Sequence, residues 1–197
     1  MLDKKNKNQK LFDQLTQFGL SESFVAGAIK KGKPIKIKKR NTLIEAGEIC
    51  NKGFFILEGG FVSRLIDPKT KEGKTVNFFL ADFHPFMSCV DSYFTENKTS
   101  LELLAIMDST ILEFSKKDLD ALMAENKDFH LYFNSLIIKA LSEETQFKNM
   151  LITSSNEEIY EFLIRHCESV IKNTPSKFIA EFMGISPEWL SKTRAKR

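Results

Sequence analysis

The chain has 197 residues, of which 42% are hydrophobic and 28% are charged, and its formal net charge is +3. This length allows one large or two small domains, and the apolar fraction is enough to fill a folded core. The first ten residues are polar and lysine-rich, with no apolar segment behind them. We therefore expect no secretory signal, no membrane span and a cytoplasmic location.

The first predicted elements are two short helices between Leu11 and Lys30. Apolar residues recur there at helical spacing, Gly19 interrupts the pattern, and Ser21 is placed to cap the second helix. The next segment, residues 30–40, holds seven Lys or Arg residues and no acid. Two interpretations stay open for this basic run: contact with DNA or acidic lipid, and the solvated face of an edge strand.

The middle of the chain has the pattern of antiparallel β-structure, with brief apolar runs separated by turn signals. The runs are Thr42 to Ile44, Phe54 to Leu57, Phe61 to Ile66, Val76 to Leu80, Leu101 to Ile106 and Thr110 to Phe114. The segment from Asp67 to Gly73 has the composition of an exposed hairpin loop. So many short strands predict a closed or rolled sheet.

The helical period returns after Ser115, which we expect to cap a helix. A longer helix is predicted from Asn126 to about Leu151, and its apolar stripe is too rich for a solvated linker. This stripe must pack on the sheet, on a second copy of itself, or on both. Residues 153–156 have the composition of a linker, and one further helix is predicted from Glu157 to Ile171.

The last two dozen residues predict two short helices joined by a tight turn. The first helix has one buried face, formed by Phe178, Ile179, Phe182 and Met183. Gly184 ends it, Ser186 is a typical N-cap, and Pro187 suits the first position of a second helix. Small residues at Ala180 and Gly184 would let the two helices approach closely.

The charge of this terminal pair favours nucleic-acid binding. From Thr174 onward there are five basic residues (Lys177, Lys192, Arg194, Lys196 and Arg197) against two acids (Glu181 and Glu188). The second helix thus offers groups for phosphate and base-edge contacts in a major groove. An ordinary helical hairpin with a solvated charged face is the other interpretation of the same residues.

In order and spacing, these elements resemble the bacterial catabolite-activator and fumarate–nitrate-regulator family of transcription factors. The stretches that carry the resemblance are Thr42-Leu43-Ile44 with Gly47-Glu48, Phe54-Phe55-Ile56-Leu57-Glu58-Gly59 with Val62, and the frame of Ala180, Gly184, Ile185 and Leu190. The resemblance implies an α+β fold: an N-terminal antiparallel β-roll of the cyclic-nucleotide-binding type with flanking helices, a long dimerisation helix and a C-terminal helix-turn-helix domain. The expected divisions are 1–125, 126–152 and 153–197.

The same resemblance implies a homodimer that binds double-stranded DNA, with RNA polymerase as a further candidate partner. Base-reading positions would be Pro187, Glu188 and Lys192, and Ser186, Ser191 and Arg194 would lie near backbone phosphates. Two features depart from the family. Thr193 stands where a larger apolar residue is usual, and the sequence ends without the β-hairpin wing of many relatives. We therefore expect fewer phosphate contacts and weaker binding by the isolated domain.

The sensor part departs further, because the family's Gly-Glu pair and its phosphate-binding arginine are missing. Residues 82–88 and 98–101 occupy the matching stretches, and the candidate effector pocket comprises His84, Phe86, Ser88, Lys98, Thr99 and Ser100. A buried phosphate needs a paired cation and hydrogen-bond donors, and only residues 98–100 could supply them. We expect an unidentified small-molecule effector or none, and no tight binding of cyclic AMP.

The sequence gives little evidence of a catalytic site or a metal site. The three cysteines and three histidines are scattered, at Cys50, Cys89, Cys167, His84, His130 and His166, with no metal-ligand spacing and no nucleophile–base motif. We therefore expect no enzyme, no metal and no cofactor. The alternative to a DNA-binding regulator is a ligand-binding or protein-interaction module whose helix-turn-helix is vestigial.

Overall fold

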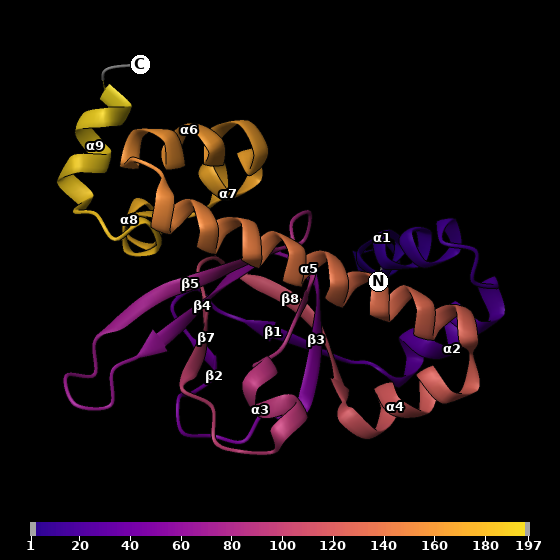
Figure 1. Ribbon diagram of the computed structural model, residues 1–197. Coiled ribbons are helices and arrows are strands. Elements are labelled where there is room, and N and C mark those ends of the chain that lie inside the picture. The colour runs from indigo at the N-terminus through magenta and orange to yellow at the C-terminus, as the bar shows by residue number, and fades with distance from the viewer. Residues whose placement is uncertain (1–2, 196–197) are drawn as a thin grey trace.

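The computed structural model describes residues 3–195, which fold into two antiparallel sheets and a set of helices (Figure 1). The long helix α5 crosses one side of the sheets. Helices α1, α2 and α4 gather at one of its ends, and α6 to α9 gather at the other. Among the described residues, no helix is both long and apolar enough to cross a membrane.

The N-terminal segment forms the two predicted helices, α1 (Asp3–Gln17) and α2 (Glu22–Lys31), but α1 begins at Asp3 and not at the predicted Leu11. Ser21 caps α2, because its hydroxyl oxygen accepts a hydrogen bond from the backbone N–H of Phe24 at 3.4 Å. Gly19 connects the two helices with φ of 106°, a conformation that glycine adopts at little cost.

Within residues 3–195, eight strands form two four-stranded sheets, with the orders β1-β8-β3-β6 and β2-β7-β4-β5. Their bounds are β1 Lys33–Ile37, β2 Thr42–Ile44, β3 Lys52–Glu58, β4 Gly60–Ile66, β5 Gly73–Leu80, β6 Phe86–Met87, β7 Leu101–Ala105 and β8 Ser109–Ser115. The six predicted runs are confirmed as strands, with ends that shift by a few residues. Part of the basic run forms β1, which pairs only with β8 and is therefore an edge strand. Neither the short β6 nor helix α3 (Val90–Thr95) was predicted.

A hydrophobic core fills the space between the two sheets. Its large side chains with no exposure to solvent are Phe54, Ile56, Phe61, Leu103 and Ile111. Burial of such side chains is the main favourable contribution to folding.

The tight corner between β3 and β4 requires glycine at Gly59. Its φ is 91°, and a Cβ atom there would lie 2.2 Å from the hydroxyl oxygen of Ser109 and 2.7 Å from the carbonyl oxygen of Asp108. No larger residue fits this corner without moving the backbone of β8.

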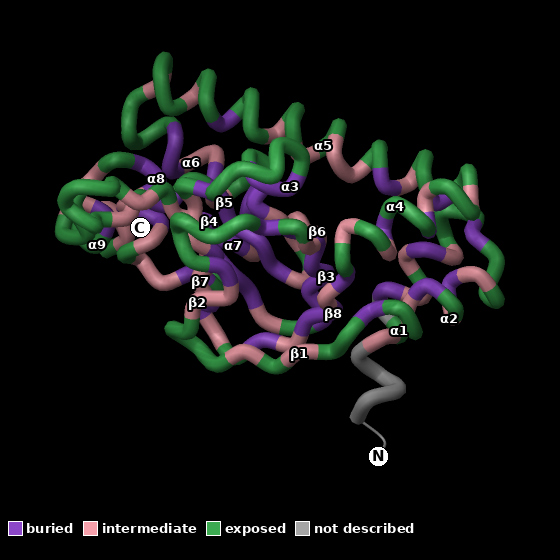
Figure 2. Tube along the Cα trace, turned by 90° about the horizontal axis from the view of Figure 1, so that it is seen from below, coloured by how far each residue is buried: buried purple, intermediate pink, exposed green. Residues whose placement is uncertain are grey.

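Two consecutive helices follow the sheets, α4 (Lys116–Glu125) and α5 (Lys127–Thr153). The side chains of Ser115 and Asn126 cap them, at 3.1 Å and 2.9 Å from the backbone nitrogens that they satisfy. The inner face of α5 buries Phe129, Phe133 and Phe147. Figure 2 shows that the outer side of α5 is exposed along most of its length.

The C-terminal helices are α6 (Asn156–His166), α7 (Glu168–Asn173), α8 (Ser176–Met183) and α9 (Pro187–Ala195). The prediction of one helix from Glu157 to Ile171 was wrong, because Cys167 leaves the helical conformation at φ −128° and ψ 43°. The break directs α7 onto β5, where the hydroxyl of Ser169 donates to a carboxylate oxygen of Asp82 at 2.7 Å. This contact between distant segments has no local sequence signal.

Candidate nucleic-acid interface and effector site

The turn between α8 and α9 has the geometry that the sequence predicted. Gly184 closes α8 in the left-handed conformation with φ of 67°, and the backbone N–H of Ile185 donates to the carbonyl oxygen of Ala180 at 3.0 Å. The hydroxyl oxygen of Ser186 then accepts from the backbone N–H of Trp189 at 3.2 Å, and α9 begins at Pro187. The two helix ends are therefore satisfied by local groups.

The inner faces of α8 and α9 belong to one hydrophobic cluster. Ile179 and Leu190 are fully buried, and Ala180 is almost so. The cluster continues into the sheets, since the ring of Phe182 meets that of Phe78 edge-on with centroids 5.0 Å apart. The terminal helix pair is thus packed against the β-roll and does not extend free into solvent.

The outer face of α9 presents five of the six residues predicted to contact DNA. Ser186, Pro187, Glu188, Ser191 and Lys192 are all exposed. Hydrogen bonds from its own backbone N–H and from the hydroxyl of Ser186 hold the pKa of the Glu188 carboxyl below its usual range. This face is polar, mostly uncommitted and carried on a braced helix.

Arg194, the sixth predicted residue, turns inward instead. Its Nε donates to the hydroxyl of Tyr160 at 3.2 Å, and its Nη1 donates to the hydroxyl of Ser176 at 2.7 Å. Its Nη2 is buried and has no hydrogen-bond partner among the described residues. The guanidinium therefore ties the end of α9 to α6 and to the start of α8, and is not presented to solvent for a phosphate.

An ionic cluster that the sequence analysis missed joins the terminal helices to the β-roll. Arg64 of β4 lies with its Nε 3.1 Å from a carboxylate oxygen of Glu181 on α8, and with its Nη1 2.6 Å from Glu102 of β7. Its Nη2 donates to the carbonyl oxygen of Gly73, and the hydroxyl of Thr75 donates to Glu181 at 2.8 Å. A lone Arg within an apolar strand was the only signal in the sequence for this cluster.

The candidate effector residues are divided among three places. His84, in the loop after β5, stacks on Phe83, and its Nε2 contacts the carboxylate of Glu143 on α5. Its Nδ1 is buried with no partner in the described part of the chain. Phe86 lies on β6, where its ring meets that of Phe133 edge-on at 5.0 Å.

The remaining candidates surround α3. The hydroxyl of Ser88 donates to the carbonyl oxygen of Lys52 at 2.8 Å. The hydroxyl of Thr99 donates to the carboxylate of Asp91 at 2.9 Å, and the backbone N–H of Ser100 donates to the same group at 3.3 Å, while Lys98 is exposed. Asp91 thus already occupies the donors that an anionic ligand would need.

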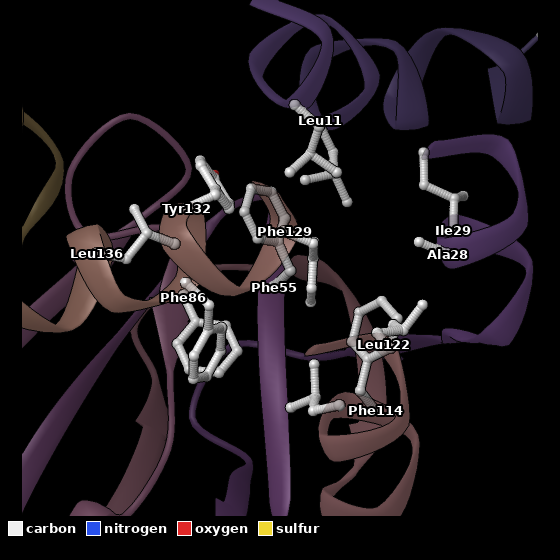
Figure 3. A pocket seen from close by; sticks show the side chains of 13 residues that line it. Leu11, Ala28, Ile29, Phe55, Phe86, Phe114, Leu122, Phe129, Tyr132 and Leu136 are labelled. Atoms are coloured by element: carbon white, nitrogen blue, oxygen red, sulfur yellow. The ribbon is translucent and has the colours of Figure 1, made fainter. Parts of the chain in front are cut away.

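An apolar pocket of about 40 Å³ lies where α1 and α2 meet α5 and the sheet (Figure 3). Leu11 and Ala28 close it from the N-terminal helices, and Phe55, Phe86 and Phe129 line it from the sheet and α5. Of the six candidate effector residues, only Phe86 takes part. The size and lining of this pocket do not fit a charged nucleotide.

No protein-family model matches the sequence, and no curated protein matches it. Solved structures do match. FixK2 from Bradyrhizobium japonicum has a TM-score of 0.69 at 12% identity, over 84% of this chain and 83% of that one. CLP from Xanthomonas campestris, a c-di-GMP-responsive global regulator, has a TM-score of 0.63 at 14% identity, over 87% and 92%. The catabolite activator protein of Thermus thermophilus has a TM-score of 0.54 at 14% identity, over 90% and 84%.

At these identities the similarity establishes the fold. The chain has the α+β architecture of the catabolite-activator type of regulator, with an antiparallel β-roll, a long helix and a terminal helix pair. The fold class predicted from the sequence is confirmed.

Proposed function

We propose that this protein is a homodimeric, sequence-specific DNA-binding transcription regulator, on the premise of the fold that it shares with regulators of the catabolite-activator type. Residues 1–125 form its effector domain, residues 126–152 its dimerisation helix and residues 153–197 its DNA-binding domain. It acts in the cytoplasm and has no catalytic activity of its own.

The outer face of α9 is the observation that carries this proposal. Ser191 and Lys192 are exposed on a helix whose first turn is capped by Ser186 and whose inner side is anchored by Leu190. A helix that is held firmly and presents short polar and basic side chains suits the major groove. Arg194 has a supporting part in this arrangement, because it braces α9 from inside the domain.

The exposed face of α5 supports dimerisation. Leu131, Ile138, Leu141 and Ile152 are all exposed, and their successive spacings of seven, three and eleven residues place them on one face. That face lies opposite the one that buries Phe129, Phe133 and Phe147. A stripe of large apolar residues in water favours pairing with the same stripe of a second copy.

The effector domain has a degenerate binding site for a cyclic nucleotide's phosphate. Asp91 places a negative charge beside Thr99 and Ser100 and already accepts their hydrogen bonds. A phosphate at this position would meet repulsion and find no buried cation, because Lys98 is exposed. The effector is therefore a molecule other than cyclic AMP, or the domain needs none. RNA polymerase is a further partner on promoters.

Recovery of genomic DNA fragments on the purified protein, at about 0.15 M salt, tests this function directly. The wild-type protein should enrich a twofold-symmetric site, and Lys192→Ala should lose it. Lys172→Ala is the matched control, since Lys172 is an exposed lysine of the same domain on α7 and should leave enrichment unchanged.

Two results would count against the proposal. If no site is enriched and affinity for DNA does not change with salt, phosphate neutralisation is absent and the terminal helices are not a DNA reader. If Lys172→Ala weakens binding as much as Lys192→Ala does, DNA is held by non-specific attraction to the basic residues of the domain and is not recognised by α9.

A further inference from the structure

Cys50 and Cys89 lie together in the β-roll, although they are far apart in the sequence. Both are free thiols in the core between the sheets, 1% and 0% exposed, and each has the largest effect on the pKa of the other. The first turn of α3 holds them in place. Cys89 is the N-cap of this helix, and the backbone N–H of Cys50 donates to the hydroxyl of Ser92 at 2.8 Å.

The two sulfur atoms have different surroundings. The hydrogen bond from the Cys89 thiol lowers the pKa of Cys50, and the backbone N–H groups of Cys89 and Lys52 add to this effect. The hydroxyl oxygen of Ser88 also lies 3.7 Å from the Cys50 sulfur. The hydrogen bond to Cys50 and burial raise the pKa of Cys89, with the carboxylate of Asp91 acting in the same direction. Cys50 is therefore the nucleophile of the pair, and Cys89 carries the proton.

We propose that Cys50 and Cys89 form a redox pair that closes to an intramolecular disulfide when it reacts with hydrogen peroxide. The Cys50 thiolate attacks one peroxide oxygen, the O–O bond breaks, and the departing hydroxide takes up the proton that Cys50 had lost. The sulfur of Cys89 then attacks the sulfur of the sulfenic acid on Cys50. The S–O bond breaks, and the hydroxyl group leaves as water with the proton of Cys89. Two thiols lose two electrons, and one peroxide becomes two waters.

Local opening of α3 gives the oxidant access. The helix has only six residues and lies at the surface, where Val90 and Phe94 are 60% and 57% exposed. Beside it, Ile49 and Asn51 border an open depression on either side of Cys50 in the chain. Short surface helices open at a far lower free energy than the whole domain.

Cys167 provides an internal control. It is also buried, at 4% exposure, but it lies in a different core cluster, with the C-terminal helices. Burial raises its pKa to about 11, with the carboxylate of Glu143 adding to the effect. An oxidant that enters through global unfolding would reach all three thiols, whereas local opening at α3 would spare Cys167.

The experiment treats the reduced full chain with hydrogen peroxide at neutral pH, quenches samples with N-ethylmaleimide in denaturant so that every remaining thiol is alkylated, and identifies the peptides by mass spectrometry. We expect a linked Cys50–Cys89 peptide to accumulate while Cys167 is still recovered as the alkylated, unoxidised thiol. Cys167→Ser should keep this reaction. Cys89→Ser should leave a sulfenic acid on Cys50 that dimedone traps, and Cys50→Ser should leave Cys89 alkylated.

The wild-type time course decides the matter even where a variant folds poorly. The inference is overturned if alkylated Cys50 and Cys89 are recovered for as long in the time course as alkylated Cys167 is. It is also overturned if the Cys50–Cys89 link forms no faster than Cys167 is oxidised. Links that join Cys167 to either residue would also contradict it. The readout does not involve DNA, so its result is independent of the proposed function.

Discussion

Arg64 on β4 and Glu181 on α8 form an ion pair across the junction between the β-roll and the terminal helices, with 3.1 Å between Nε and Oε2. Their side chains are only 15% and 16% exposed. Together with the contact between Phe78 and Phe182, this pair sets where α8 and α9 lie relative to the sheets. A change of α9 position in a regulator of this fold would have to break these contacts or keep them through a joint movement.

Removing one partner of that ion pair should destabilise the protein. In Glu181→Gln the guanidinium of Arg64 keeps its charge in a largely buried site, and of its two carboxylate partners it retains only Glu102. We expect the free energy of unfolding in urea to fall by about 1–3 kcal/mol. Glu168→Gln breaks the exposed pair with Lys172 and should cost less than about 0.5 kcal/mol. Equal losses of unfolding free energy in the two variants would show that the ion pair at the junction stabilises the protein no more than an exposed ion pair does.

Arg194 and Lys192 should separate stability from DNA binding. Arg194→Ala removes the hydrogen bonds to Tyr160 and Ser176, and we expect a lower thermal midpoint and a loss of about 1–2 kcal/mol. Lys192→Ala should leave the midpoint unchanged and weaken binding to the enriched DNA site, because it removes a base-reading side chain. The inward position of Arg194 is contradicted if Arg194→Ala melts like the wild type and weakens DNA binding as Lys192→Ala does.

A charge in the apolar stripe of α5 should prevent dimer formation. Leu141→Glu places a carboxylate among Ile138 and its counterparts in the second copy, where it would be desolvated without a partner. Light scattering should show a dimer for the wild type and a monomer for this variant. Gln146→Glu, an exposed change on another flank of the same helix, should remain dimeric. A wild-type monomer at micromolar concentration would refute the proposed interface.

Cyclic AMP should not bind with micromolar affinity. The carboxylate of Asp91 repels a phosphate, and it already accepts the hydrogen bonds of Thr99 and Ser100. Isothermal titration calorimetry with the full chain should give no saturable heat at micromolar concentrations. Micromolar binding would mean that the nucleotide displaces Asp91 or occupies another site.

Much of the fold follows from rules that act over a few residues. Ser21 and Ser115 cap their helices as predicted, because a hydroxyl next to an apolar helical pattern satisfies a free N–H at the helix end. The turn at Gly184 and the start of α9 at Pro187 were likewise predictable, because each depends on the conformation of one residue. Short apolar runs between turn signals located the main strands for a similar reason.

The site depended on contacts between segments that are distant in the sequence. Arg194 and Lys192 are both basic residues on α9, and only the position of Tyr160 and Ser176 directs one of them inward. The break at Cys167, the ion pair of Arg64 with Glu181 and the separation of the effector residues have the same origin. Caps and periodicity are set by neighbours along the chain, whereas burial and partners are set by packing, which no short stretch contains.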